Sequence, residues 1–189
     1  MENRVILIMG AKHSGKSLCA RALSEIIGGK AVDLDELVEE QTGKTPRELF
    51  IEGQVFFKKA EVRALASLIQ GSPSQTEGKN LVIAVGGGII DNDEAMTLIS
   101  KARVPSADRQ LITVFLEISA ETSWQRIMDG SNDGVLPPLI NTNNPKETHL
   151  ALHNRRAKAY RAVAGITIFS ENKSPEEIAR EIVDSLSKI

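Results

Sequence analysis

One segment near the N-terminus determines the architecture: Val5-Ile6-Leu7-Ile8-Met9-Gly10-Ala11-Lys12-His13-Ser14-Gly15-Lys16-Ser17. It begins with an apolar run rich in β-branched side chains, which predicts a strand buried on both faces of a parallel sheet. Residues 16–27 then show the apolar spacing of an amphipathic helix. The segment is therefore expected to form a buried strand, a polar loop and a helix, in that order.

The loop between this strand and this helix matches the pattern G-x-x-x-x-G-K-[ST]. Its two glycines allow backbone angles that turn successive N–H groups inward, and the helix N-terminus points its positive dipole end at the same place. Lys16 can reach the β- and γ-phosphates of ATP, and the Ser17 hydroxyl can bind Mg²⁺. From His13 we expect only the backbone to contribute. The expected nucleotide-binding residues of the loop are Gly10, His13, Ser14, Gly15, Lys16, Ser17 and Leu18.

The rest of the chain alternates strand-like apolar runs with helical patterns. Strands are expected at residues 31–33, 81–85, 111–116 and 166–169, and helices at 91–102, 120–128, 146–164 and 175–189. Residues 49–69 are expected to form one or two helices, and Pro46 sits where a helix could begin. This alternation predicts an α/β three-layer sandwich with a parallel central sheet. No repeat or linker divides the chain, so residues 1–189 are expected to form one domain, in which the polar segment 129–146 is a mobile loop.

Composition limits the partners. A net charge of −2 creates no broad positive field for nucleic acid. No apolar run approaches the roughly 20 residues that span a bilayer, and the N-terminus lacks the basic start of a signal peptide. Cys19 is the only cysteine, which fits a reducing cytoplasm. We therefore expect a cytoplasmic monomer that binds a small molecule and neither nucleic acid nor membrane.

Two carboxylates close the second expected strand. Asp33 and Asp35 flank Leu34, and alternation along a strand puts both on one side, facing the phosphate loop if the first two strands are neighbours. One could then hold the water shell of Mg²⁺, while the other orients the acceptor hydroxyl or takes its proton. The alternative is a helix N-cap without a catalytic role, because Asp35-Glu36-Leu37-Val38 opens a helix and aspartate is favoured at that position.

Further motifs follow the phosphate loop and the aspartate pair in a fixed order. They are Gly43, Glu48-Leu49-Phe50 and Gly53, then Phe57-Lys58-x-x-Glu61, Gly86-Gly87-Gly88 and Arg156-x-x-x-Tyr160-x-x-x-Ala164. In this order the chain resembles the shikimate kinase family over nearly its whole length. The glycine triplet is also compatible with a plain tight turn, and Arg156 with a solvated helix face.

The resemblance implies ATP-dependent phosphorylation of the 3-hydroxyl of shikimate, which gives 3-phosphoshikimate and ADP. It makes Lys16, Asp33 and Asp35 the catalytic residues, with Asp35 as the base and Asp33 near the metal. Lys58 and Arg156 would bind the substrate carboxylate. The implied substrate site comprises Asp35, Lys58, Gly86, Gly87, Gly88 and Arg156, and Arg126 and Lys173 would flank the nucleotide.

The chain departs from the family at two positions. Lys58 stands where the family has arginine, which keeps the charge but loses the bidentate geometry. The family's mobile lid carries an arginine, yet no arginine occurs between Arg126 and Arg155, and Lys146 is a lysine at the far end of this segment. Two other functions therefore stay open: a kinase of another small polyol or hydroxy acid, and a nucleotide-binding protein with weak or no activity.

Overall fold

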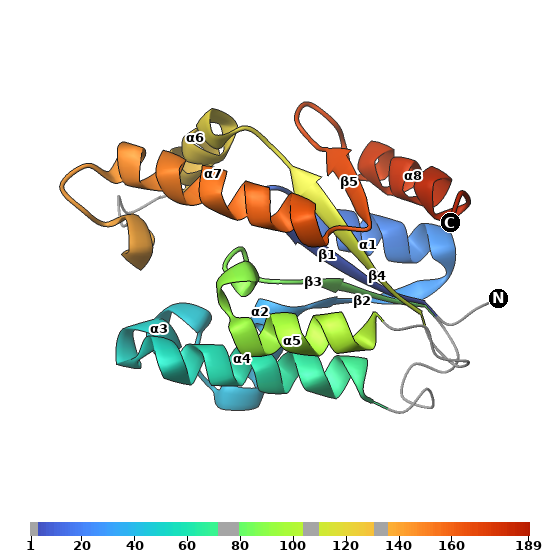
Figure 1. Cartoon of the computed structure of the whole chain (residues 1–189), viewed down its shortest axis with the longest axis horizontal. Coiled ribbons are helices and arrows are strands. Elements are labelled where there is room, and N and C mark those ends of the chain that lie inside the picture. The colour runs from blue at the N-terminus through green and yellow to red at the C-terminus, as the bar shows by residue number, and fades with distance from the viewer. Residues whose placement is uncertain (1–3, 72–79, 104–109, 131–135) are drawn as a thin grey trace.

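Parallel pairing runs through the whole sheet (Figure 1). The computed structural model describes residues 4–71, 80–103, 110–130 and 136–189, and within them five strands pair in the order β2-β3-β1-β4-β5. The strands are β1 (Arg4–Gly10), β2 (Gly29–Asp33), β3 (Asn80–Ala84), β4 (Gln110–Glu117) and β5 (Ile166–Phe169). The prediction of a parallel central sheet is confirmed, and β1 lies at its centre.

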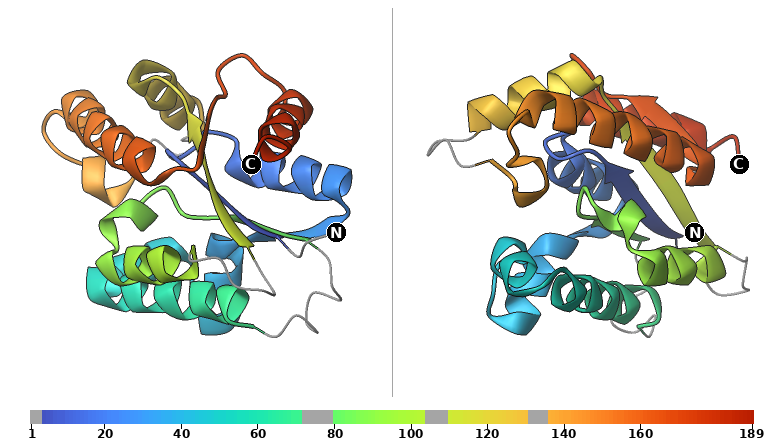
Figure 2. Two further views of the ribbon diagram at one scale, coloured as in Figure 1. Left: turned by 45° about the vertical axis from the view of Figure 1, so that its right-hand side comes forward. Right: turned by 60° about the vertical axis from the view of Figure 1, so that its left-hand side comes forward.

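Helices cover both faces of the sheet. They are α1 (Lys16–Ile27), α2 (Leu34–Thr42), α3 (Pro46–Glu52), α4 (Gln54–Ile69), α5 (Asp93–Ala102), α6 (Ala120–Gly130), α7 (Pro145–Val163) and α8 (Pro175–Leu186), with short 3-10 turns η2 (Ile89–Asp91) and η3 (Pro138–Ile140). Figure 2 shows α1 and α8 on one side of the sheet and α4, α5 and α7 on the other. The three layers expected from the sequence are therefore present.

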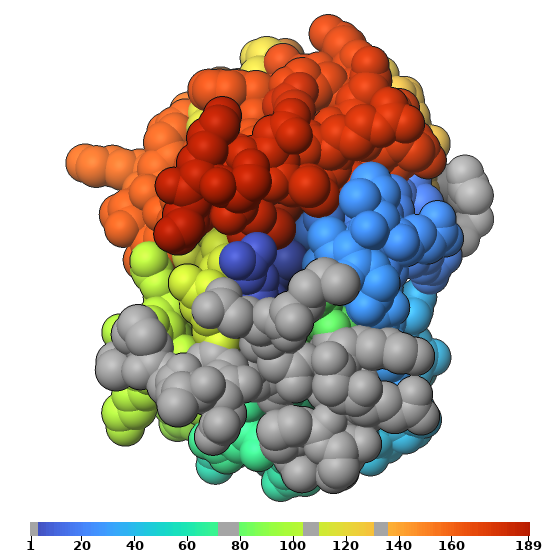
Figure 3. Space-filling model, turned by 90° about the vertical axis from the view of Figure 1, so that its right-hand side faces the viewer, coloured from blue at the N-terminus to red at the C-terminus, as the bar shows by residue number. Residues whose placement is uncertain are grey.

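The central strand β1 divides the core into two halves. Val5, Leu7 and Met9 pack into the core shared with α2, α4, α5 and α7. Ile6 and Ile8 point the opposite way, into the core shared with α1 and α8, which lie side by side (Figure 3). All five side chains are buried, because successive residues of a strand face opposite sides of the sheet.

Local capping sets the helix ends. Residues 49–69, expected to form one or two helices, belong to two helices separated by Gly53, and α3 begins at Pro46 behind a capping box made by Thr45. Ser174 caps α8 in the same way, with Glu177 completing a capping box. The expected helix at 91–102 begins later, at residue 93, because the side chain of Asn92 accepts the amide of Ala95 and caps α5 there.

Part of the predicted mobile loop at 129–146 falls on residues 131–135, which lie outside the described residues. The described remainder contains η3 and the first turn of α7, which begins at Pro145. Among the helices that the structure describes, none combines the length and the apolar character needed to cross a membrane.

The pairing of β1 with β3 positions the polar segments. Ile8 pairs with Ala84 in register, and the Val85 amide donates to the Ile8 carbonyl at 3.1 Å. The phosphate loop after β1 and the glycine triplet after β3 therefore leave the same edge of the sheet side by side. Since β2 pairs with β3 as well, Asp33 reaches this edge too, opposite Ala84.

Gly10→Ala should destabilise the fold more than a matched glycine substitution. Gly10 has a φ of 153°, and a Cβ there would lie 2.6 Å from the Leu116 carbonyl oxygen and 2.9 Å from Ser14 Oγ. Gly43 has a φ of 69° with open space around it, so Gly43→Ala carries backbone strain alone. Urea unfolding should show Gly10→Ala to be about 1–3 kcal/mol less stable than Gly43→Ala. Equal stability of the two variants would contradict the close approach.

Candidate active site

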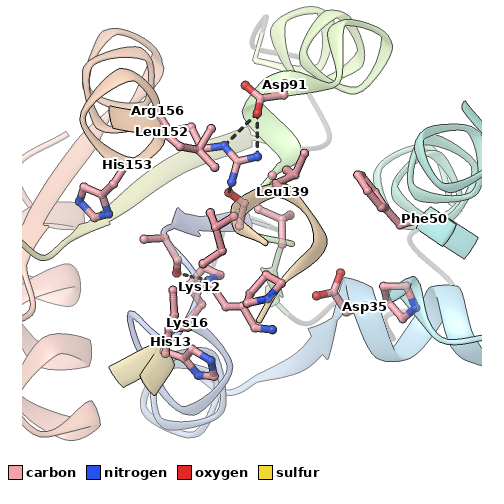
Figure 4. Close-up of a pocket in the computed structure, with 18 of the residues that line it drawn as sticks. Lys12, His13, Lys16, Asp35, Phe50, Asp91, Leu139, Leu152, His153 and Arg156 are labelled. Atoms are coloured by element: carbon pink, nitrogen blue, oxygen red, sulfur yellow. Dashed lines mark hydrogen bonds and ion pairs between the residues drawn. The ribbon is translucent and has the colours of Figure 1, made fainter. Parts of the chain in front are cut away.

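A cavity of about 410 Å³ opens at the carboxyl ends of β1, β2 and β3. Its wall includes the phosphate loop, the aspartate pair, the glycine triplet, and parts of α3, α4 and α7. Figure 4 shows Lys12, Lys16 and His13 on one side of this cavity, Asp35 across from them, and Arg156 with Asp91 at another end. The pocket thus joins a phosphate-binding region to a second, cationic region.

The phosphate loop has the backbone that its sequence predicts. Gly10 and Gly15 adopt positive φ angles of 153° and 91°, and His13 joins them at 60°. The Lys16 ammonium donates to the Ala11 carbonyl at 2.7 Å. Burial lowers the pKa of Lys16 to about 8, although Asp35 and Asp33 oppose this effect. A buried, partly desolvated ammonium at this position is suited to bind phosphate oxygens.

Ser17 and Asp33 meet directly beneath the loop. The Ser17 hydroxyl donates to Asp33 Oδ2 at 2.5 Å, and Asp33 Oδ1 accepts the Asp35 amide at 2.9 Å. Asp33 is therefore the residue that caps α2, so the alternative in which Asp35 is the cap is wrong. A hydroxyl beside a carboxylate fits the oxygen ligands that Mg²⁺ prefers, with waters completing its shell.

Because Asp33 caps α2, the side chain of Asp35 is not needed as a cap, and Asp35 lines the cavity. Burial raises its pKa and the neighbouring Asp33 adds to the effect, whereas Lys16 and Lys12 oppose it. A carboxylate with a raised pKa accepts a proton more readily than a solvated one. Asp35 therefore has the environment of a general base facing the phosphate loop.

A second carboxyl group, that of Glu61, lies beside Asp35. A Cβ on Gly86 would lie 2.9 Å from Asp35 Oδ1 and 3.2 Å from Glu61 Oε1, so both carboxyl groups face the same point over the glycine. Glu61 is 1% exposed; its Oε2 accepts from Asn92 Nδ2 at 2.8 Å, but Oε1 has no hydrogen-bond partner. Burial raises the pKa of Glu61 to about 7.

At the cationic end, Asp91 brings three basic residues together. Arg156 donates from Nε to Asp91 Oδ2 at 2.8 Å, and Arg155 donates from Nη1 to Asp91 Oδ1 at 2.8 Å. The Lys58 ammonium donates to the backbone carbonyl of Asp91. Burial would raise the pKa of Asp91, but the hydrogen bonds from Arg155 and Arg156 lower it, so Asp91 is ionised.

Arg156 belongs to the pocket and not to a solvated face. Its side chain is 16% exposed, against 58% for Arg155. Its Nη1 donates to the Gly87 carbonyl at 3.2 Å, which the Tyr160 hydroxyl also contacts at 3.3 Å. The glycine triplet is therefore part of the pocket wall as well as a turn, and Gly87 and Gly88 line it.

The two residues expected to flank the nucleotide lie outside the cavity wall. Arg126 Nη1 donates to the His13 carbonyl at 2.9 Å, so it adjoins the phosphate loop. Lys173 pairs with Glu181 at 2.7 Å. Leu18 is 57% exposed on α1. None of these three residues lines the cavity, and Arg126 is the one seen to contact the phosphate loop.

Sequence reasoning missed Asp91 and Lys12 as pocket residues. Both line the cavity. Asp91 sits three residues after the glycine triplet, in a segment expected to be the start of a helix, and nothing local links it to an arginine 65 positions away. Lys12 occupies a variable position of the loop pattern, so the pattern does not show that a charged side chain there lines the cavity.

A parallel sheet with a phosphate loop after its first, central strand is the arrangement of a P-loop nucleotide-binding protein. The family model for shikimate kinase matches residues 9–187. A shikimate kinase of Lactococcus lactis (strain IL1403) is 35% identical over 179 residues, covering 94% of both chains, and one of Actinobacillus pleuropneumoniae (strain L20) is 27% identical over 100% of this chain and 98% of its own length. The chain belongs to the shikimate kinase family.

Solved structures agree with this assignment. Shikimate kinase of Acinetobacter baumannii in complex with shikimate matches with a TM-score of 0.80 at 27% identity, covering 100% of this chain and 94% of that one. The enzyme of Aquifex aeolicus matches with a TM-score of 0.73 at 28% identity, covering 97% and 96%. The family consists of phosphotransferases with an alcohol acceptor, and ATP is their phosphoryl donor.

Glu61→Gln should stabilise the fold at pH 8. Between the ordinary carboxyl pKa of 4.5 and the folded pKa of about 7, the folded protein keeps a proton that the unfolded chain has released. The free energy of unfolding therefore falls as the pH rises through this window. Glutamine does not titrate, and its amide can donate toward Asp35. We expect a gain of roughly 1–3 kcal/mol at pH 8 that shrinks at pH 4.

Urea titrations at the two pH values measure this difference. Glu94→Gln on the exposed face of α5 is the matched control and should change stability little at either pH. A Glu61→Gln protein with the same advantage over wild type at both pH values would contradict the buried, proton-holding state of Glu61.

Proposed function

We propose that the protein transfers the γ-phosphoryl group of ATP to the 3-hydroxyl of shikimate, giving 3-phosphoshikimate and ADP. One observation supports this most strongly: the phosphate loop, Asp35, Lys58 and Arg156 all line a single cavity, and Asp35 lies across it from the loop. Phosphoryl transfer needs such an arrangement, because donor and acceptor must lie in line with a base beside the acceptor oxygen.

The nucleotide would bind on the β1 side of the cavity. In this proposal the inward amides of Gly10, His13, Ser14 and Gly15 and the Lys16 ammonium hold the phosphates, and Leu18, Arg126 and Lys173 border the nucleotide at the outer surface. Ser17 and Asp33 would hold Mg²⁺, directly or through water. A metal held there would supply positive charge that neutralises the phosphates.

The acceptor would bind on the β3 and α7 side. The planar fork of Arg156 can bind the substrate carboxylate, and the Lys58 ammonium adds a second positive charge beside it. Gly86, Gly87 and Gly88 present only backbone, so the sugar-like ring can approach closely. Asp35 would accept the proton of the reacting hydroxyl, and its raised pKa makes it a better base for that proton.

The pairing of Asp91 with Arg156 favours a second candidate acceptor. Asp91 Oδ2 already takes two N–H groups of this arginine, at 2.8 Å from Nε and 2.7 Å from Nη2. A substrate carboxylate would have to share the fork with Asp91, whereas a less charged polyol would not. A kinase of another small polyol or hydroxy acid is therefore the alternative.

Purified protein with Mg-ATP should release ADP only when the acceptor is added, and shikimate should be the best acceptor in a panel of small hydroxy acids and polyols. A coupled assay of ADP production measures this. Lys16→Ala should lower kcat by about 100-fold or more, because it removes a cation from the phosphates. Its urea unfolding should remain cooperative. ATP binding without turnover of shikimate would contradict the proposal, and a better polyol acceptor would favour the alternative.

Lys58→Arg should lower the KM for shikimate. The Lys58 ammonium bonds the Asp91 carbonyl at the cationic end, where a guanidinium can add a bidentate contact to a carboxylate. A gain of about 1 kcal/mol corresponds to a KM roughly fivefold lower at similar kcat. Lys59→Arg, on the exposed neighbour, is the control and should leave KM unchanged. An unaltered KM for Lys58→Arg would indicate that the acceptor carboxylate does not bind at this end.

A further inference from the structure

Lys12 lies where the two halves of the pocket meet. Its amide nitrogen is the closest atom to a Cβ placed on Gly87, at 2.9 Å, so this turn of the phosphate loop rests against the glycine triplet. The Lys12 side chain is exposed and lines the cavity. In Figure 4 it lies on the phosphate-loop side, with Asp35 on the opposite side.

The charge of Lys12 affects the pKa of both Asp35 and Lys16. It opposes the raised pKa of Asp35 and contributes to the lowered pKa of Lys16, after the larger effect of burial in each case. The Lys12 ammonium is therefore within electrostatic range of both Lys16 and Asp35, because screening by water weakens more distant charges. This agrees with its place on the phosphate-loop side of the cavity, across from Asp35.

Lys12 also has no other partner in the part of the chain that the structure describes. Its ammonium forms no hydrogen bond or ion pair there, unlike three other cations of the pocket. Lys16 donates to the Ala11 carbonyl, Arg156 to Asp91, and Lys58 to the Asp91 backbone. An ammonium without a partner at the junction is available to a ligand that carries negative charge.

Two other basic residues fit this position less well. Lys146 pairs with Glu121 at 3.0 Å and does not line the cavity. Arg47 does line it, from the exposed start of α3 beside Phe50, but its charge is not among those that shift the pKa of Asp35 or Lys16. Among the described residues, Lys12 is thus the cation best placed to contact the phosphoryl group while it is transferred from donor to acceptor.

We propose that Lys12 is a catalytic residue whose ammonium contacts the γ-phosphoryl oxygens during transfer and neutralises the charge that develops there. This inference rests on the proposed function. In the transition state the three equatorial oxygens of the phosphoryl group carry dispersed negative charge, and a cation that binds this arrangement more tightly than the bound ATP raises kcat.

The step balances with ATP as the only co-reactant. A lone pair of the acceptor oxygen forms the new O–P bond to the γ-phosphorus, and the bond from that phosphorus to the β–γ bridging oxygen breaks. The bond electrons stay on the β-phosphate oxygen of ADP, and the hydroxyl proton goes to Asp35. Lys12 keeps its proton throughout and exchanges no electrons.

Lys12→Met is the decisive variant, because methionine keeps the length of the side chain and loses the charge. We expect kcat with shikimate to fall about 100-fold or more, with both KM values within about threefold of wild type. Lys12→Arg should recover most of kcat, since it restores the cation. Lys30→Met is the matched control and should leave kcat unchanged, because Lys30 is an exposed lysine near the amino end of β2, away from the carboxyl ends that form the site.

A second readout separates this inference from the choice of acceptor. ADP, Mg²⁺ and aluminium fluoride together imitate the transferring phosphoryl group, and calorimetry compares their binding with that of ADP and Mg²⁺ alone. Wild type should gain affinity from aluminium fluoride, and Lys12→Met should lose that gain while it binds ADP normally. If wild type fails to turn over shikimate, the proposed function fails, and the fluoride measurement still decides the role of Lys12.

Three results would overturn the inference. The first is a kcat for Lys12→Met within threefold of wild type. The second is a loss confined to the KM for ATP, which would make Lys12 a ground-state binding group. The third is an unchanged aluminium fluoride gain in Lys12→Met, or its loss in Arg47→Met instead, which would move the role to the cation on α3.

Discussion

The hydrogen bonds between β1 and β3 are the constraint on which the site depends. They hold Ile8 opposite Ala84 and end at the contact between the Val85 amide and the Ile8 carbonyl, at 3.1 Å. Two chain segments about 75 residues apart therefore leave the sheet at the same level, and the glycine triplet comes against the amide of Lys12. A slip of the register would separate the phosphate loop from the acceptor wall, because the distance between donor and acceptor is fixed by this ladder alone.

Charge is arranged along this edge at a cost to the folded state. Burial raises the pKa of Asp35 and of Glu61; repulsion from Asp33 adds to the shift of Asp35, and repulsion from Asp35 adds to that of Glu61. Burial lowers the pKa of Lys16 to about 8. Each shift means that the fold disfavours the charged form of the group, so these charges cost folding stability. Bound phosphates and a metal would supply the missing counter-charges. The pocket therefore lowers folding stability in order to keep charged groups in position, which is the trade-off expected of a preorganised catalytic pocket.

The sequence predicts those parts of the structure that local chemistry decides. The strand, the phosphate loop and the helix from Val5 to Ile27 could be recognised, because apolar spacing and paired glycines act within a few residues. The sequence located the aspartate pair but did not show which aspartate caps a helix, since either carboxylate can do so. The hydrogen bond from the Asp35 amide to the Asp33 side chain shows that Asp33 is the cap. Asp91 could not be found in this way. Its partners are on α7, and its role depends on α7 crossing the glycine triplet, which no pattern near residue 91 encodes.

The two ends of the pocket differ in how freely their cations can act. At the cationic end, Asp91 pairs with both Arg155 and Arg156, so a ligand bound there would meet side chains whose geometry is set before binding. At the junction, the Lys12 ammonium forms no hydrogen bond or ion pair with the described residues, and its side chain is exposed. A rigid fork suits a substrate carboxylate that does not change during the reaction, whereas a flexible ammonium suits a phosphoryl group that moves from one oxygen to another. The same cation could not serve both ends well, because a fixed charge that is ideal for the ground state would hold the phosphoryl group back.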